Sequence, residues 1–452
     1  MNFSSTSLVS RLALPALCIF GVLRVDLSAE EWSRFRGPNG SGVAEASNLP
    51  ATFDSTNTVW KIDVGKGWSS PVTWQGKVFI TEETGPGKRA VVCLNMRDGH
   101  RLWAYDVPFA EHRKHNFNNF ASSTPFVDAD RVYVNWTSGD AVEAMALDHE
   151  GKLLWRKENL ANYIHEHGSG ASPVVSDGIM LVRAEFEAEK DGKPLGTAEQ
   201  EGWKSCILGL DAATGEQKWK LEVPNTLNPY STPIIRDLPG GAHEFIVANT
   251  TSGFMGLDTK KGTINWQHNP GYKQRSVGSI VMKDNVLFAA LGAGDGGKES
   301  ALIKLGGAKP EEIGSITKNI PYVPTPLLIG DRMYMLRDGG ILTCLKYPTG
   351  ETIYSERLTS AAPESASEGG KGKRKGGSST KYFSSPVAAD GKIYCCSQTG
   401  DVVVVKAGDQ FQILGASSLD GPMNATPAIA ANHLFIRTEK SIWCMGVKPT
   451  LP

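Results

Sequence analysis

The chain of 452 residues lacks the short motifs of several common chemistries. It contains no P-loop, no nucleophile elbow and no HExxH sequence, and none of its cysteines falls in a CxxC or CxxCH motif. These absences exclude, by their usual signatures, a phosphate-cradling loop, an α/β-hydrolase serine, a zinc protease and a covalently attached c-type haem. The formal net charge is -1, so no global field recruits nucleic acid or an acidic membrane surface.

A hydrophobic run long enough to span a bilayer comfortably is also lacking. The apolar stretch at residues 12–23 is short, ends abruptly at Arg24, and is followed by a small residue, Ala29, at a suitable cleavage position. This pattern predicts a secretory signal at residues 1–29. We therefore expect an exported protein, periplasmic or extracellular, with no membrane span after cleavage. An uncleaved anchor is the alternative. Cys18 does not predict a lipoprotein, because the residue before it is bulky.

Internal repetition is the strongest pattern that is present. A small-small-Pro signature recurs and predicts the start of a short strand. Its copies are SSP at 69–71, STP at 123–125, ASP at 171–173, STP at 231–233, a degenerate GSI at 278–280, PTP at 324–326, SSP at 384–386 and ATP at 425–427. Each is followed by a turn, an alternating strand such as KVFI at 77–80, a third strand, and a fourth strand that opens with Trp or a substitute. Four short strands per unit indicate an all-β fold, an eight-bladed β-propeller over residues 58–447.

The two ends of the chain complement each other. The eighth unit, ATPAIAANHLFIRTEKSIWCMGV, has three strands and lacks a fourth. Residues 58–64, TVWKIDV, look like a fourth strand without its first three. We expect this strand to complete the last blade and close the ring, because closure leaves no exposed blade edge. Residues 30–57 form an N-terminal extension, and residues 448–452 form a tail.

The phrase DAATGEQKW at 211–219, together with the strand starts and the eightfold count, resembles the PQQ-like β-propeller repeats. The opening WSRFRGPNGSG at 32–42 is similar to the start of exported bacterial PQQ-like proteins, common in planctomycetes. The resemblance covers roughly residues 32 to 447. It implies a propeller related to those of quinoprotein alcohol dehydrogenases, which use PQQ and calcium, and of an outer-membrane assembly lipoprotein, which binds no quinone. It is specific for the fold and weak for the activity.

We interpret the repeated aromatic residue of the fourth strand as a packing device between blades, because a large flat side chain is first of all a source of buried area. The residues at this position are Trp60, Trp103, Trp155, Trp219 and Trp266, with Tyr354 as the substitute in the sixth unit. Adjacent cysteines are a ring disulfide beside the quinone in some quinoprotein dehydrogenases. Cys395 and Cys396 fall in an apparent strand, where neighbouring side chains point to opposite faces. We therefore expect inert thiols there.

Function is expected in the loops that join one blade to the next, which gather around the channel mouth. Two such loops, 111–120 and 162–168, hold four of the nine histidines. The candidate ligand-binding residues are His112, Arg113, His115, Asn116, Asn118, His165, Glu166, His167, Tyr230 and Arg275. Imidazoles with a carboxylate suit zinc or a similar ion, which makes His115, His165 and His167 candidate metal ligands. The alternative is a polar rim that ties down long loops.

Other connecting loops add a collar of aromatic and polar side chains that suits a sugar or a peptide, or that packs loop tips. These residues are Trp68, Asn228, Tyr230, Tyr272, Arg275, Tyr322 and Tyr382. Two insertions interrupt the repeats. Residues 185–204 are charged and predict a surface hairpin or loop. Residues 359–381 are low in complexity and basic, which favours a disordered spacer over contact with an anionic polymer.

The calcium ligands and the carboxylate base that the resemblance implies for a quinoprotein dehydrogenase have no residue-by-residue match in this sequence. We therefore expect a binding or scaffold module for a protein or carbohydrate ligand, without redox chemistry of its own and monomeric. A PQQ- and calcium-dependent oxidoreductase is the alternative, and a metal-dependent hydrolase or lyase at the histidine loops is a third possibility.

Overall fold

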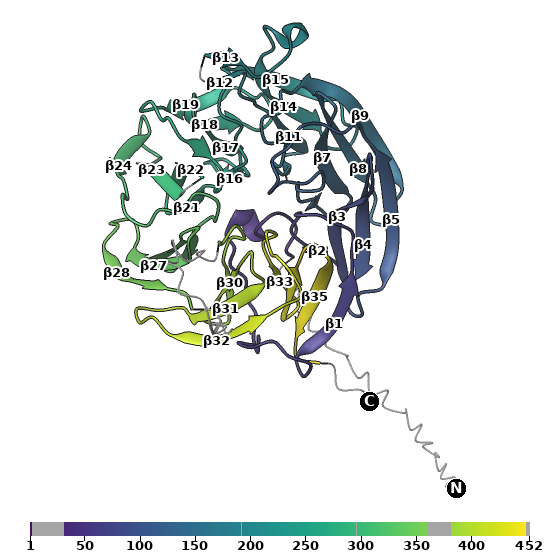
Figure 1. Cartoon of the computed structure of the whole chain (residues 1–452), viewed down its shortest axis with the longest axis vertical. Coiled ribbons are helices and arrows are strands. Elements are labelled where there is room, and N and C mark those ends of the chain that lie inside the picture. The colour runs from purple at the N-terminus through teal and green to yellow at the C-terminus, as the bar shows by residue number, and fades with distance from the viewer. Residues whose placement is uncertain (2–30, 191, 295, 360–380, 449–452) are drawn as a thin grey trace, which may run out of the picture.

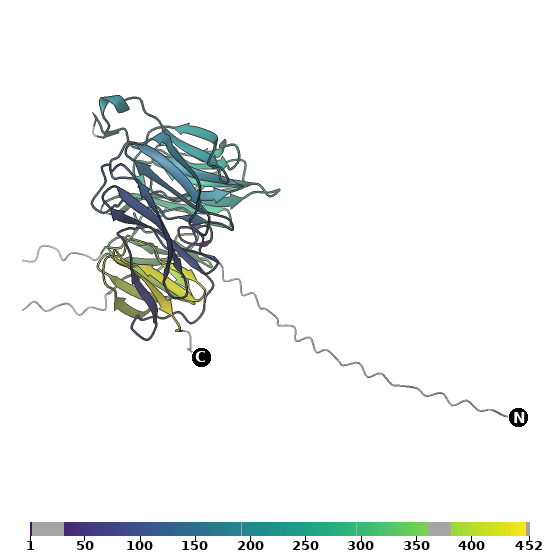
Figure 2. The same cartoon turned by 90° about the vertical axis from the view of Figure 1, so that its right-hand side faces the viewer.

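The computed structural model describes Met1 and residues 31–448, except 191, 295 and 360–380. Over these residues the strands form eight blades around a central axis, face-on in Figure 1 and edge-on in Figure 2. Apart from Met1, the expected signal at 1–29 lies outside the described residues, as do most of the low-complexity stretch and the tail beyond 448. No helix of the described chain has the length and hydrophobicity needed to cross a membrane.

Each blade is an antiparallel sheet, and in all but the last blade the strands follow chain order from the axis outward (Figure 1). Blade 1 consists of β2 (Val72–Trp74), β3 (Lys77–Gly85), β4 (Lys88–Asn95) and β5 (Arg101–Pro108), and blade 2 of β6 (Phe126–Val127), β7 (Val132–Ser138), β8 (Ala141–Leu147) and β9 (Leu153–Asn162). Blade 3 consists of β10 (Val174–Ser176), β11 (Ile179–Ala184), β14 (Ser205–Asp211) and β15 (Gln217–Val223), and blade 4 of β16 (Ile234–Asp237), β17 (His243–Asn249), β18 (Gly253–Asp258) and β19 (Ile264–His268).

The remaining four blades have the same plan. Blade 5 consists of β21 (Val281–Lys283), β22 (Val286–Ala293), β23 (Gly296–Lys304) and β24 (Glu311–Gly314), and blade 6 of β25 (Leu327–Ile329), β26 (Arg332–Leu336), β27 (Ile341–Lys346) and β28 (Thr352–Arg357). Blade 7 consists of β29 (Val387–Ala389), β30 (Lys392–Cys396), β31 (Asp401–Lys406) and β32 (Ile413–Ser418), and blade 8 of β33 (Ala428–Ala430), β34 (His433–Arg437), β35 (Ser441–Gly446) and β1 (Thr58–Asp63). The pairing of β1 with β35 joins the N-terminal strand to the last blade, as the two chain ends predict.

Two blades carry additions. In blade 3 the insertion forms a short exposed hairpin, β12 (Glu189–Lys190) with β13 (Lys193–Pro194), and a turn of 3-10 helix, η2 (Ala198–Gln200). In blade 5 an extra strand, β20 (Arg275–Ser276), pairs with β22. Because β22 and β23 are long, their hairpin reaches from the blade to the channel mouth.

Four of the repeated tryptophans each join one blade to the next. The indole N–H of Trp155 in blade 2 donates to the carbonyl oxygen of Ala212 in blade 3 at 3.0 Å. Trp60, Trp103 and Trp219 donate in the same way to the turn of the following blade, at 2.9 Å each. Trp266 departs from this pattern and donates to Glu244 of its own blade. The tryptophan therefore acts as a joint between blades.

The core lies between neighbouring blades, where side chains alternate between two faces of each strand. Cys395 packs in the hydrophobic cluster shared by blades 6 and 7, whereas Cys396 packs in the cluster shared by blades 7, 8 and 1. All six cysteines of the described chain are free and buried. Burial raises the pKa of the Cys395 thiol to about 12, so both residues behave as small apolar side chains.

The N-terminal extension plugs the centre of the ring. Its single helical turn, η1 (Pro38–Gly40), is the purple element at the middle of Figure 1. Arg36 is fully buried and donates to the carbonyl oxygens of Thr325 and Pro326 in blade 6 and of Pro386 in blade 7. Arg34 donates to the carbonyl of Pro233 in blade 4. The extension thus replaces an open channel by a floor.

Candidate functional site

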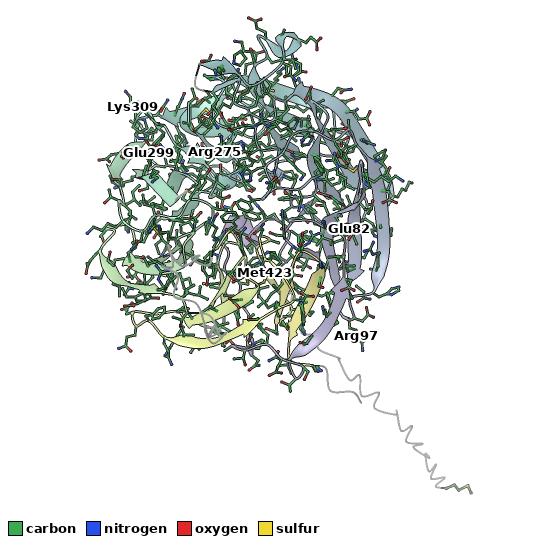
Figure 3. The ribbon with its side chains drawn as sticks, in the orientation of Figure 1. Glu82, Arg97, Arg275, Glu299, Lys309 and Met423 are labelled. Atoms are coloured by element: carbon green, nitrogen blue, oxygen red, sulfur yellow. The ribbon has the colours of Figure 1, made fainter. Side chains whose placement is uncertain are left out.

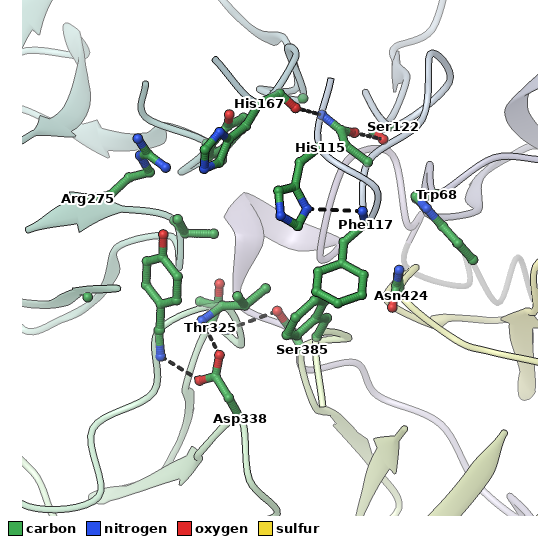
Figure 4. Close-up of a pocket in the computed structure, with 18 of the residues that line it drawn as sticks. Trp68, His115, Phe117, Ser122, His167, Arg275, Thr325, Asp338, Ser385 and Asn424 are labelled. Atoms are coloured by element: carbon green, nitrogen blue, oxygen red, sulfur yellow. Dashed lines mark hydrogen bonds between the residues drawn. The ribbon is translucent and has the colours of Figure 1, made fainter. Parts of the chain in front are cut away.

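A cavity of about 530 Å³ lies at the channel mouth above this plug. Its lining comes from every blade and from the plug itself (Figure 4). Six aromatic side chains form much of the wall: Phe35, Trp68, Phe117, Tyr230, Tyr322 and Phe383. Phe35 belongs to the plug. We call this cavity the cup; its size and its aromatic lining are typical of small-molecule sites.

A ring of hydroxyl groups lies at the base of the cup. The middle residue of every strand-start signature is Ser or Thr, and its hydroxyl oxygen accepts the backbone N–H of the equivalent residue in the preceding blade. Seven such bonds of 2.8–3.1 Å join the residues Ser70, Thr124, Ser172, Thr232, Ser279, Thr325, Ser385 and Thr426; among the described residues the bond from Ser172 to Thr232 is the missing one. All of them except Ser279 line the cup.

One wall of the cup holds a buried charge network centred on Arg275. Its Nη2 lies 2.5 Å from Glu166 and 3.3 Å from Glu187. Lys190 of the blade 3 hairpin lies 2.6 Å from Glu166. Burial alone would raise the pKa of Glu166, but the hydrogen bond from Lys190 and the charge of Arg275 outweigh it and hold that pKa at about 2. Burial raises the pKa of Glu187 to about 7, and the negative charge of Glu166 adds to this shift.

Asp338 is the one carboxylate among the described residues that line the cup. Its two oxygens accept the backbone N–H groups of Tyr322, at 2.8 Å, and Val323, at 3.3 Å (Figure 4). Burial raises the pKa of Asp338, and these N–H donors oppose the shift. The residue therefore holds the loop before blade 6 in place.

The loop before blade 2 reaches across to blade 7 at the rim of the cup. Phe117, at its tip, is about half exposed and makes an edge contact with Phe383, with ring centroids 5.5 Å apart. Lys381 lies over the Phe117 ring at 5.3 Å. His115 accepts the Phe117 backbone N–H at Nδ1, so the neutral ring carries its proton on Nε2.

Five of the ten candidates from the sequence line the cup: His115, Asn118, His167, Tyr230 and Arg275. Glu166 lies behind them and holds Arg275. The other four candidates, His112, Arg113, Asn116 and His165, do not line it. The two loops do come together, since the His115 backbone N–H donates to the His167 carbonyl oxygen at 3.1 Å.

The candidate metal ligands His115, His165 and His167 are not gathered into one cluster in the described chain. The rings of His112 and His165 stack with centroids 3.7 Å apart, and His165 Nε2 donates to the carbonyl oxygen of Gly139. Burial, together with the neighbouring His112, lowers the pKa of His165 to about 3. Within the described ranges, no three His, Cys, Asp or Glu side chains are arranged to hold a metal ion. His112 and His165 instead pack the two loops together.

The lining of the cup can also be compared with the ligands that a bound PQQ and its calcium ion would need. Calcium takes six to eight oxygen ligands, several of them carboxylates. Asp338 is the only carboxylate among the described residues that line the cup, and both of its oxygens already accept backbone N–H groups. A PQQ–calcium pair therefore does not fit the residues present.

Of the predicted aromatic collar, Trp68, Tyr230, Arg275 and Tyr322 line the cup. Tyr382 is buried instead, and Asn228 donates to the Tyr163 hydroxyl. The sequence interpretation missed Phe35, Asp338, Lys381, Phe383, Asn424 and the hydroxyl ring. The ring had a signal, since Ser or Thr occupies the middle of all eight signatures.

Comparisons with known proteins agree with this architecture. The family described as outer membrane protein assembly factor BamB matches residues 49–202. No curated protein matches the chain. Among solved structures, BamB from Moraxella catarrhalis has a TM-score of 0.59 at 14% identity, over 87% of this chain and 98% of that one.

Two quinohemoprotein alcohol dehydrogenases are also similar. ADHIIG from Pseudomonas putida HK5 has a TM-score of 0.63 at 12% identity, over 94% of this chain and 81% of that one. The enzyme from Comamonas testosteroni has a TM-score of 0.63 at 12% identity, over 94% and 82%. Similarity at these identities concerns the fold, not the activity. The repeats, the ring and these matches identify the chain as a PQQ-like β-propeller.

Proposed function

We propose that this protein is an exported binding module whose cup holds a small ligand, without redox chemistry of its own. The observation that carries the proposal is the cup itself, a cavity of about 530 Å³ that is floored by the plug and walled by aromatic and hydrogen-bonding side chains. Export is supported by the signal-like N-terminus and by the similarity to an outer-membrane assembly family. Scaffolding of a partner protein at the rim, where Phe117 is exposed, is compatible with this role.

A cup-filling variant gives a direct test. Gly294 lines the cup, and a Cβ at this position meets no atom within 4 Å. Gly294→Trp should fill the cup without disturbing the blades. Gly314→Trp is the matched control, because Gly314 ends the outer strand β24 and also has no atom within 4 Å of an added Cβ.

The three proteins are screened by thermal unfolding against sugars, organic acids, amino acids and short peptides. A ligand of the cup stabilises the native protein and Gly314→Trp by mass action, but not Gly294→Trp. A panel without such a compound contradicts the proposal. The quinoprotein alternative is tested in parallel by adding PQQ and calcium. A bound chromophore with alcohol-dependent dye reduction would replace the proposed role by that of a dehydrogenase.

A further inference from the structure

We infer that the cup selects a ring-shaped organic acid, a small molecule that carries a carboxylate on a sugar or an aromatic ring. This inference rests on the proposed binding function and names the class of ligand. It depends on the balance of hydrogen-bond donors and acceptors in the cup, on its charges and on its walls.

The base of the cup is a source of donors. Seven of the eight hydroxyl oxygens in the ring use a lone pair to accept a backbone N–H, for example Thr325 Oγ1 from the N–H of Ser279 at 2.8 Å. A hydroxyl group also has one proton to donate. Among the described residues, none of the seven hydroxyl groups that line the cup donates to a protein acceptor. Their protons are therefore available to acceptor atoms of a ligand.

The walls add further donors. The indole N–H of Trp68, the phenol of Tyr322 and the amide nitrogen of Asn424 make no hydrogen bond to a protein acceptor within the described chain, and all three residues line the cup. Asn424 already uses its amide oxygen to accept from Gln398 at 2.9 Å. His115 presents its protonated Nε2. The cup therefore offers mainly donors, which suits a ligand rich in acceptor oxygens.

The charges of the lining point the same way. Arg275 and Lys381 are positive, and Asp338 is the single negative side chain among the described lining residues. Both ion pairs of Arg275 use Nη2, and its Nε is buried without a partner in the described chain. Arginine is the side chain best suited to binding a carboxylate, and Arg275 lines the cup.

The shape of the ligand follows from the aromatic walls. Trp68 and Phe117 line the cup on the side away from Arg275 (Figure 4), and Tyr322, whose backbone N–H donates to Asp338, also lines it. Flat faces of this kind pack against the faces of sugar or aromatic rings. An acidic ring compound fits both the faces and the donors.

Four probes separate the two kinds of ring and test the charge: glucuronate against glucose, and benzoate against benzyl alcohol. Binding of each to the purified protein is measured by calorimetry. We expect at least one acid to bind ten times or more as tightly as its neutral partner, because hydrogen bonds to a charged group are about twice as strong as neutral ones. The affinity should fall as ionic strength rises.

Variants locate the binding. Lys381→Gln and the charge-balanced pair Arg275→Gln with Glu166→Gln should each weaken acid binding tenfold or more. If the double variant fails to fold, Tyr322→Phe takes its place. It removes a single hydroxyl and should weaken acid binding severalfold. Lys309→Gln, at the outer edge of the ring far from Arg275, is the matched control and should bind normally (Figure 3).

A neutral probe that binds as tightly as its acid would overturn the inference and leave the proposed function standing. Acid binding that none of these cup variants weakens would overturn it as well. If none of the four probes binds, this inference is wrong, and the wider panel described above decides separately whether the cup holds any ligand.

Discussion

Gly215 of blade 3 lies against the indole ring of Trp155 of blade 2. A Cβ at Gly215 would stand 2.5 Å from Cε3 of that ring, and the glycine has φ 72°. The same contact recurs between three further pairs, Trp60 and Gly99, Trp103 and Gly151, and Trp219 and Gly262. The glycine of each turn and the tryptophan of the blade before it thus form one joint.

Gly215→Ala should lower the free energy of unfolding by roughly 2–5 kcal/mol, because the left-handed backbone costs about 1–2 kcal/mol and the crowded ring adds about 1–3 kcal/mol. Gly178→Ala is the control. Gly178 also has φ 72°, but no atom lies within 4 Å of an added Cβ, so only the backbone cost applies. Urea unfolding of both variants measures the difference, and equal losses would contradict the joint.

The hydroxyl ring contributes stability as well as donors. Ser385→Ala should cost about 1–3 kcal/mol, because the buried N–H of Thr325 loses its acceptor at 2.9 Å. Ser385→Thr should restore most of this stability, since Thr occupies the equivalent place in blades 6 and 8. Thermal unfolding of the two variants is the measurement, and a Thr variant as unstable as the Ala variant would argue against the ring.

The raised pKa of Glu187 predicts a loss of stability at higher pH. The pKa of its carboxyl is about 7 in the folded protein, against an ordinary pKa of 4.5. Between these values the folded state holds a proton that the unfolded state has released, so stability is full below pH 4.5 and falls as pH rises through 7. Glu187→Gln should remove this part of the pH dependence. Unfolding measured from pH 5 to pH 8 in both proteins should show a shallower fall in the variant.

The stacked histidines predict that, at acidic pH, the stability of the protein rises as the pH rises. The pKa of His165 lies at about 3, below its ordinary value of 6.5, because burial and the neighbouring His112 disfavour the charged ring. Between these values the unfolded state binds the extra proton, so stability rises as the pH rises from 3 to 6.5. His165→Phe should flatten that rise. Comparing slopes rather than absolute stabilities separates this effect from the lost hydrogen bond to Gly139, and an unchanged slope would contradict it.

The plug is expected to be essential to the ring. Arg36→Leu should destabilise the protein by more than about 3 kcal/mol, because it leaves several buried carbonyl oxygens without a donor, including those of Thr325 and Pro386. Arg97→Leu is the control, since Arg97 is exposed at the edge of the ring (Figure 3). Chemical unfolding of the two variants tests this, and equal stability would show that the plug is dispensable.

The ring itself could be predicted from the sequence because its causes are local and repeated. Strand starts, turn glycines and tryptophans recur, and the missing strand of the last unit matches the lone strand at Thr58–Asp63. Each blade makes the same demands on its residues, so eight copies of one pattern reinforce each other.

The site was harder to predict because it depends on loops that do not repeat. From the sequence, His165 is grouped with His115 and His167 as a candidate metal ligand. In the structure its ring stacks on the ring of His112 instead. Neither periodicity nor charge in WSRFRGPNGSG signals that Phe35 floors a cavity or that Arg36 contacts two blades. Such contacts join residues nearly 300 or more positions apart, as between Arg36 and Thr325.

The position of the plug also constrains the order of folding. Residues near the start of the chain are synthesised first, yet Arg36 finds its acceptors in blades 6 and 7, and β1 finds its partner in blade 8. A nascent chain that ends before blade 6 lacks the acceptors of Arg36 and the strand that pairs with β1. The ring can therefore close, and Arg36 can gain its acceptors, only after nearly the whole chain has been made.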